Sequence, residues 1–317
     1  MLRVNRKLLQ AFEDQLNPAD PFSSTIPFRI LGYGEISTVF QIGDMDDLAL
    51  KRMPPFASRE QRTQYRRVLE EYHEILAYRI GIRVADYLCE ELTNKDGEHI
   101  LYIAQKRFPE DSVGNRRLQQ CSDEELTLLL HQLLENIIKI WEKNAQDEPG
   151  EQIGLDAQIS NWAFPDWQTG KTPKPIYLDT STPLIRRRGR ELLNTEVFLK
   201  SVPSFLVWIV KLAFLQQVLD RYYDLHLVLT DFVANFYKEG QPQWIPQAIR
   251  TINRFLSLRA PHLSVAPLNE KKVRKYYKED AFIWIIFFNF RRLDRFLKTR
   301  LLRRKYNFIL PGKIKRF

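Results

Sequence analysis

A glycine-containing turn between two apolar segments is the feature that most restricts the fold of this chain. Residues 31–39 read LGYGEISTV and connect a predicted strand at 28–31 to another at 38–42. Glycine adopts backbone angles that let main-chain N–H groups approach phosphate oxygens. Taken alone, Gly32 and Gly34 fit an ordinary tight hairpin at least as well.

The residues after this turn predict a small β-rich region. A strand at 48–53 carries Lys51, whose ammonium group can reach nucleotide phosphates as a point charge, although a single strand lysine is usually just solvated. A helix is predicted at 59–80, and Gly81 is a suitable cap for its C-terminal end. A hairpin formed by 84–92 and 100–106 around an Asp-Gly turn completes the region.

Beyond residue 107 the pattern is mostly helical. Ser122 and Glu125 form a capping-box pattern at the start of a helix that runs to Trp141. Further helices are predicted at 204–227 and from 280 to about 305, and a short β segment interrupts them between 153 and 184. The expected divisions are an N-terminal helical extension, a β-rich lobe, a helical lobe and a basic, aromatic-rich C-terminal segment, at 1–27, 28–107, 108–270 and 271–317.

Composition indicates a folded, reducing-compartment protein. The 317 residues are 44% hydrophobic and 27% charged, and two cysteines imply no disulfide framework. The N-terminal 20 residues read as a charged amphipathic helix and lack the apolar core of a signal peptide. The longest apolar run, 281–288, is shorter than the roughly 20 residues that span a bilayer. We expect a cytoplasmic protein, with peripheral association at the inner membrane surface as an alternative.

Several polar residues carry weaker signals. The five histidines and two cysteines have no metal-ligand spacing. Asp231 and Asn235 echo a metal-binding pair, but the favoured interpretation is that such residues cap a helix.

The glycine turn, followed by Ala-Leu-Lys at 49–51, resembles the nucleotide-binding half of the protein-kinase-like superfamily, which includes aminoglycoside phosphotransferases, choline-kinase-like enzymes and bacterial sugar kinases. In this resemblance Ser37 stands at the third glycine position, Val39 covers the adenine ring and Lys51 contacts phosphate. The resemblance implies an α+β, bilobal protein-kinase-like fold. Its small β-rich N-lobe contains one main helix, and its larger C-lobe is mostly helical.

The same resemblance implies a nucleotide site that uses both lobes. A glutamate of the helix at 59–80 should pair with Lys51, and Glu71 is favoured, with Glu74 next and Glu70 also available. The adenine ring is expected to hydrogen-bond the backbone near Gln105 to Arg107. Phosphates would be held by Lys51 and by backbone donors from Gly32, Gly34 and Ser37.

Two further segments match the catalytic and metal-binding motifs of the superfamily. Asp156 and Asn161 have the D-x-x-x-x-N spacing, in which Asp orients or deprotonates the substrate hydroxyl and Asn holds a metal ion. Asp179 follows an apolar strand and matches the second metal ligand. Two positions depart from the pattern: Gly154 replaces the usual histidine, and Thr180-Ser181 replaces Phe-Gly, which favours the phosphotransferase branch over eukaryotic-type protein kinases.

These matches imply an ATP- and Mg²⁺-dependent phosphotransferase that transfers the γ-phosphoryl group to a hydroxyl of a small-molecule, lipid or sugar acceptor. Asp156, Lys51 and Glu71 are the expected catalytic residues, and Asn161 and Asp179 the expected metal ligands. Because of Gly154, a pseudokinase-like nucleotide-binding module that presents an interaction surface is the alternative. The sequence does not indicate an oligomeric state.

Positive charge is concentrated at the C-terminus. The chain carries a net charge of +9, but residues 271–317 contain 16 Lys and Arg against 3 Asp and Glu, which leaves −4 for the first 270 residues. Phe282, Ile286, Leu293 and Leu301 recur at helical spacing within this segment. Either the helix packs on the lobe with its basic side solvated, or it contacts a polyanion, for which an anionic membrane is favoured over nucleic acid.

Overall fold

The N-lobe is built on a five-stranded antiparallel sheet with the order β1-β2-β3-β5-β4. This computed structural model describes all residues except 1, 35, 147–149, 169, 201, 204–206, 208–214 and 313–317. The strands are β1 (Phe28–Tyr33), β2 (Thr38–Ile42), β3 (Leu48–Arg52), β4 (Tyr87–Thr93) and β5 (His99–Lys106). The glycine turn joins β1 to β2, as predicted, and β4 and β5 form the predicted hairpin.

Strand alternation gives the sheet two apolar faces, and each is covered by one helix. The inner face packs Met53, Leu101 and Ile103 against α2 (Arg59–Glu74). The helix continues as a wider turn over Ile75–Ile80 and ends at Gly81, whose φ of 76° is the left-handed conformation that glycine readily adopts.

The outer face of the sheet is covered by α1 (Arg6–Gln15), which confirms the predicted amphipathic N-terminal helix. Leu9 and Phe12 are fully buried there, against a sheet cluster that includes Phe40 and Leu50. The helix begins after Asn5, whose side chain accepts a hydrogen bond from the Leu8 N–H.

A buried ion pair fastens α1 to the sheet. Both oxygens of Glu13 accept hydrogen bonds of 2.7 Å from the Arg52 guanidinium, and the Tyr102 hydroxyl donates a third. A buried charge pair requires such additional hydrogen bonds to offset its desolvation.

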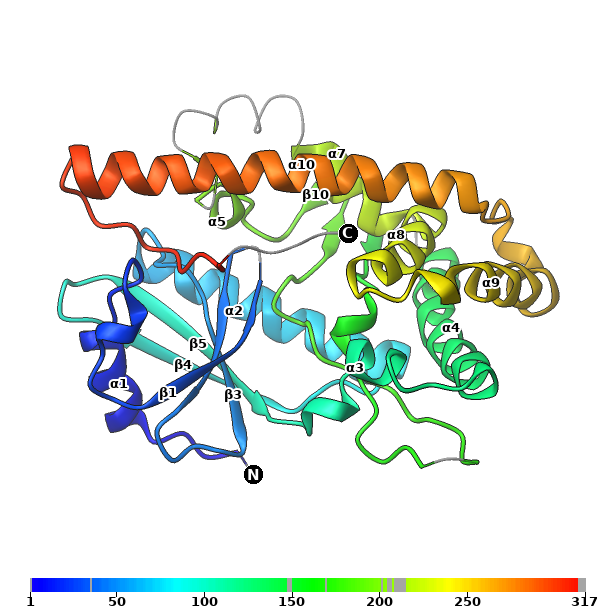
Figure 1. Cartoon of the computed structure of the whole chain (residues 1–317), viewed down its shortest axis with the longest axis horizontal. Helices are drawn as coiled ribbons and strands as arrows, with labels where there is room; N and C mark the ends of the chain where they lie inside the picture. Colours follow the sequence, from blue (N-terminus) through cyan, green and yellow to red (C-terminus); the bar gives the residue numbers. More distant parts are fainter. Residues whose placement is uncertain are drawn as a thin grey trace.

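The C-lobe is mostly helical, as expected, with a short three-stranded sheet and a two-stranded sheet near its junction with the N-lobe (Figure 1). Ser122 and Glu125 form the predicted capping box by exchanging backbone-to-side-chain hydrogen bonds at the start of α4. The helices are α3 (Gly114–Leu118), α4 (Asp123–Gln146), α5 (Glu196–Leu199), α7 (Leu215–Asp220), α8 (Leu225–Lys238), α9 (Ile245–Arg259) and α10 (Glu270–Phe296). The strands are β6 (Glu151–Ile153), β7 (Trp162–Ala163), β8 (Ile176–Tyr177), β9 (Ile185–Arg187) and β10 (Arg190–Glu191).

Two predicted helices differ from the structure. In the interval 204–227, residues 204–206 and 208–214 lie outside the described part, and the remainder is not one helix, because Asp224 starts α8 by accepting the Leu227 N–H. The last helix begins ten residues earlier than expected, since Asn269 caps it through the Lys272 N–H. It also ends earlier, at Phe296, followed by a wider turn over Leu297–Leu301.

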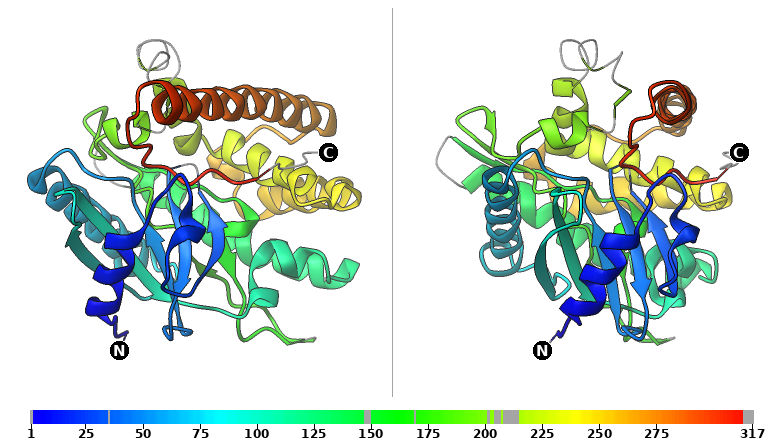
Figure 2. Two further views of the ribbon diagram at one scale, coloured as in Figure 1. Left: turned by 60° about the vertical axis from the view of Figure 1, so that its left-hand side comes forward. Right: turned by 90° about the vertical axis from the view of Figure 1, so that its left-hand side faces the viewer.

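The C-terminal segment connects the two lobes. Helix α10 packs on α8, where Tyr277 stacks on Tyr237 with ring centroids 4.8 Å apart. The chain then returns to the N-lobe, as both views of Figure 2 show. There Lys305 donates 2.7 Å hydrogen bonds to Asp96 and Glu98 of the β4–β5 hairpin. Part of the basic tail is therefore neutralised within the protein.

Within the described residues, the helices include none that combines the length and apolar character needed to cross a bilayer.

Candidate functional site

Lys51 lies on the inner face of the sheet, near its centre. It is paired with Val39 of β2 on one side and Ile103 of β5 on the other, and Val39 is in turn opposite Gly32. Residues opposite one another in antiparallel strands point to the same face. The sheet thus places Lys51 and Val39 together, beside the glycine turn.

The ammonium group of Lys51 contacts the C-lobe. Its Nζ lies 2.8 Å from Asp179 Oδ1 and 2.7 Å from Ser181 Oγ. The Ser181 hydroxyl and backbone N–H also donate to Asp179 Oδ1. Beneath them, the buried Tyr65 of α2 donates its hydroxyl hydrogen to the backbone carbonyl of Ser181. Strand β3, helix α2 and the segment of Asp179 to Ser181, which are far apart in sequence, therefore meet here.

The surroundings of Asp179 favour its ionised form. Burial alone would raise the pKa of this carboxyl group, but the charge and hydrogen bond of Lys51, together with the hydrogen bonds from Ser181, leave the pKa below its ordinary value. A carboxylate held ionised at neutral pH is suited to binding a cation.

Asp156 and Asn161 belong to a loop between β6 and β7. Hydrogen bonds to the backbone carbonyl groups of both residues hold this loop in place. The carbonyl oxygen of Asp156 accepts hydrogen bonds of 3.1 Å from the Asn161 side chain and from the Tyr177 hydroxyl. The Leu178 N–H donates to the Asn161 carbonyl at 2.8 Å, which places Asn161 next to the strand that leads to Asp179.

The surroundings of Asp156 shift the pKa of its carboxyl group upward, in the opposite direction to that of Asp179. Burial, and the negative charges of Asp231 and Asp179, raise its pKa to about 7. At neutral pH this group is close to half-protonated, so it can accept or return a proton without a large free-energy cost.

Asp231 is a site residue that the sequence interpretation set aside. It lies in the middle of α8 and accepts a 3.1 Å hydrogen bond from Gln158, whose own backbone N–H donates to Asp156 Oδ1. Burial and the charge of Asp280 raise the pKa of Asp231. The predicted capping role is therefore wrong, because Asp224 caps this helix. Only the position of Asp231, one turn and a half into an apolar helix, could have indicated that it faces inward.

Glu71 is not paired with Lys51. It forms an ion pair with Arg187 of β9, which also pairs with Glu151. The reason is the helical phase of α2, whose buried side consists of Arg62, Tyr65, Val68, Leu69 and Tyr72. Glu70, Glu71 and Glu74 all lie off this side, and Glu70 pairs with Arg66. The Lys51–Glu71 pair is thus corrected to Lys51–Asp179 and Glu71–Arg187.

Gly154, the departure from the superfamily pattern, has a packing explanation. A Cβ atom at this position would lie 2.9 Å from the carbonyl oxygen of Tyr222 and 3.2 Å from Leu184. The Gly154 carbonyl accepts a hydrogen bond from the Tyr72 hydroxyl, and the next N–H, of Leu155, donates to that same Tyr222 carbonyl. Residues of the segment before α8 thus occupy the space that a histidine side chain would need.

The residues expected near the adenine ring are joined to neighbouring segments. The side chain of Gln105 donates to the Leu178 carbonyl at 2.8 Å, and so links the end of β5 to the residue before Asp179. The Arg107 N–H donates to the Asp47 carbonyl at 2.7 Å. That N–H is therefore already engaged within the protein, and the remaining backbone groups of this segment stay the predicted contacts.

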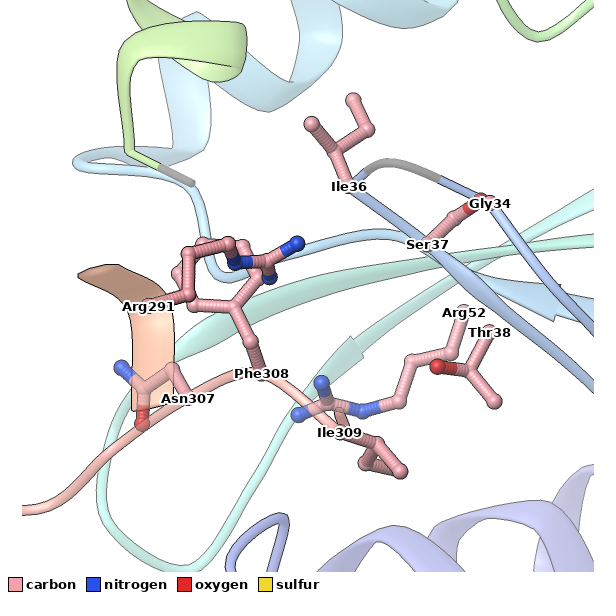
Figure 3. A pocket seen from close by; sticks show the side chains of 9 residues that line it. All are labelled: Gly34, Ile36, Ser37, Thr38, Arg52, Arg291, Asn307, Phe308 and Ile309. Atoms are coloured by element: carbon pink, nitrogen blue, oxygen red, sulfur yellow. The ribbon is translucent and has the colours of Figure 1, made fainter. Parts of the chain in front are cut away.

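The glycine turn is closed by the Gly34 N–H, which donates to the Ser37 carbonyl at 2.9 Å. A Cβ atom on Gly34 would lie 2.7 Å from Ser37 Oγ, so a larger residue there would require the Ser37 side chain to rotate. Figure 3 shows Ser37 with Arg291 and Phe308 around a small pocket. Arg52 also lines it, and since Arg52 follows Lys51 on β3, the pocket lies on the outer face of the sheet, away from Lys51.

The structure search found complexes of aminoglycoside 2'-phosphotransferase-IIIa with GDP. A mutant of that protein has 12% sequence identity and a TM-score of 0.35, with 72% of this chain and 90% of that chain covered. The wild-type protein has 11% identity and a TM-score of 0.26, with 72% and 91% covered. No curated protein sequence matches the chain.

A family model matches residues 20–295, which include the sheet, both loops that carry the polar residues described above, and most of α10. The chain therefore belongs to the family described as a family of unknown function, DUF6206.

Proposed function

We propose that this chain is an ATP-dependent phosphotransferase that uses Mg²⁺ and transfers the γ-phosphoryl group to a hydroxyl of a small-molecule, lipid or sugar acceptor. The observation that carries the proposal is the contact between Lys51 of the sheet and Asp179 of the C-lobe, 2.8 Å apart, beside the loop of Asp156 and Asn161. This arrangement gathers a cation for phosphate, an ionised carboxylate for metal and a proton acceptor for a hydroxyl in one place.

The residues present fit a Mg²⁺ ion bound with nucleotide. Mg²⁺ in such sites takes only one or two carboxylates, because phosphate oxygens and water complete its octahedron. Asp179 offers an ionised carboxylate, and Asn161 donates through its Nδ2, so its Oδ1 is the atom suited to a metal. Bound there, the ion would offset phosphate charge. Lys51 would then exchange one of its contacts for a phosphate oxygen.

The proton transfer is assigned to Asp156. As the acceptor oxygen forms its bond to the γ-phosphorus, the bond from that phosphorus to the bridging oxygen breaks and ADP leaves. The proton of the acceptor hydroxyl passes to the Asp156 carboxylate and then to solvent. With a pKa of about 7, Asp156 is matched to this role near neutral pH.

Isothermal titration calorimetry with a non-hydrolysable ATP analogue and Mg²⁺ tests the proposal. The wild-type chain should bind, Lys51→Met and Asp179→Asn should bind at least about tenfold more weakly, and Asp156→Asn should bind normally. Lys95→Met, at an exposed turn, is the matched control. An absence of binding by the wild-type chain would refute nucleotide use altogether.

A second candidate, a nucleotide-binding module without turnover, is favoured by one observation. Glu71 is held by Arg187, so Lys51 lacks the glutamate partner that the superfamily resemblance implies. ATP hydrolysis or transfer that disappears in Asp156→Asn would exclude this candidate. Tight nucleotide binding with no turnover in the wild-type chain, at any pH between 6 and 9, would support it.

A further inference from the structure

The long C-terminal helix α10 has one side that is buried and another that is apolar yet exposed. Val273, Tyr277, Phe288, Arg291 and Asp294 are its buried residues. With about 3.6 residues per turn, Phe282, Ile286, Leu293 and Phe296 fall together on the side that faces away from them. These four side chains are all exposed, Phe282 by 64% and Phe296 by 54%.

This exposed apolar row is not required to hold the helix in place. The buried side packs on α8, and the chain beyond α10 is fastened to the N-lobe by Lys305 and by the buried Tyr306. Ile283 and Ile285, 65% and 50% exposed, widen the row further. Isolated exposed apolar residues are ordinary, whereas a contiguous group of this kind marks a surface that contacts something else.

Cations lie at both ends of the apolar row. Lys271, Arg274 and Lys278 are exposed on the first turns of the helix, and Arg300 and Arg304 are exposed after its last turn. Arg292 is exposed beside the row itself. The helix itself carries four acidic residues, Glu270, Glu279, Asp280 and Asp294. Asp294 is buried and pairs with Lys298, and Glu279 pairs with Lys275. The surface is therefore apolar in the middle and positive around it.

We propose that the exposed side of α10 docks in the interfacial region of an anionic lipid bilayer, with the helix lying parallel to the membrane plane. Apolar side chains would enter the boundary between headgroups and acyl chains, while Lys and Arg contact lipid phosphates. A nucleic acid would use the cations but gain little from six exposed aliphatic and aromatic side chains, so the combination of apolar and basic residues favours lipid. Figure 1 shows α10 running along one edge of the molecule.

Co-sedimentation of the full-length chain with phosphatidylcholine vesicles, with and without phosphatidylserine, tests the proposal. We expect binding to the vesicles that contain phosphatidylserine, little to pure phosphatidylcholine, and weaker binding as salt rises. Phe282→Asp with Ile286→Asp should reduce the affinity about tenfold or more. Leu258→Asp, at an equally exposed apolar position on α9, should leave it unchanged.

A charge variant keeps the test independent of the apolar substitutions. Arg300→Glu with Arg304→Glu should weaken binding most at low salt, and Lys95→Glu, on the β4–β5 turn, is its control. No vesicle binding by the wild-type chain, or binding unaffected by both pairs of substitutions, would overturn the proposal. An apolar variant that unfolds would also overturn it, because the row would then be part of the core. So would a variant that turns a wild-type dimer into a monomer, because a second copy would then cover the row.

Discussion

Replacing Asp156 with Asn should stabilise the folded chain, and more so as the pH rises. The Asp156 carboxyl has a usual pKa of 3.8 and a folded-state pKa of about 7, because burial and the charges of Asp231 and Asp179 disfavour its ionised form. Between these two values the folded chain keeps a proton that the unfolded chain has released. The free energy of unfolding of the wild-type chain therefore falls as pH increases, because the unfolded chain can release this proton and the folded chain cannot.

The size of the effect follows from the width of that interval. At about 1.4 kcal/mol for each pH unit over which the two states differ by one proton, the ionised Asp156 costs the folded chain about 4 kcal/mol above pH 7. Asn is uncharged, has nearly the same shape, and can still accept the 3.2 Å hydrogen bond from the Gln158 N–H. The variant should gain almost nothing at pH 4, about 2 kcal/mol near pH 5.5 and about 4 kcal/mol at pH 8.

Urea unfolding at a series of pH values measures this difference directly, because every other titrating group is common to both proteins. Asp44→Asn, at an exposed turn, is the matched control and should differ from wild type by less than about 0.5 kcal/mol throughout. A stability difference for Asp156→Asn that stays constant with pH, or that grows toward acid pH, would refute the assigned environment of this carboxyl group.

Three further predictions concern the Glu13–Arg52 ion pair of the N-lobe, the loop that carries Gly154 and Asp156, and the neighbouring Asp231. Glu13→Gln should lower the free energy of unfolding by about 3 to 5 kcal/mol in urea titrations, because the buried Arg52 guanidinium loses its counter-charge. Gly154→Ala should cost about 1 to 3 kcal/mol, since its Cβ atom would lie 2.9 Å from a backbone carbonyl oxygen; an unchanged urea midpoint would contradict this. Turnover should rise with pH through about 7 as Asp156 ionises, and Asp231→Asn should move that rise to lower pH by removing a neighbouring negative charge.

Elements with strong local signals could be predicted from the sequence. The β1–β2 turn, the hairpin at Asn94–Gly97 and the helix cap at Gly81 each depend on residues whose backbone preferences are met within a few positions. The start of α8 could not be found in this way. Leu225 to Lys238 continue the apolar pattern of the preceding residues, and only the turn at Asp224 separates them. Hydrophobic periodicity alone does not reveal such a break.

In the candidate site too, residues that belong to a short motif could be predicted, whereas contacts that depend on the packing of distant segments could not. Lys51, Asp156, Asn161 and Asp179 could be named because each follows a short motif. The partner of Lys51 could not, because the motif implied a glutamate of α2, whereas the helical phase of α2 leaves all three candidate glutamates off its buried side, and Lys51 pairs with Asp179 instead. Ser181 carried no signal, since its role comes from a hydrogen bond to Lys51, 130 positions earlier in the chain.

The two central aspartates show how one site can hold unlike chemical roles under the proposed function. Both are partly buried, and burial raises the pKa of each. Only Asp179 has a cation in contact, so the Lys51 ammonium group outweighs desolvation there, whereas Asp156 faces two further carboxylates. Carboxyl groups whose environments separate their pKa values in this way are suited to divide the work, one as a permanently charged metal ligand and the other as a proton acceptor. It follows that Lys51→Met should raise the pKa of Asp179 and move both carboxyl groups toward the same protonation state. Such a variant would lose metal binding together with phosphate binding, which a lysine acting on phosphate alone would not produce.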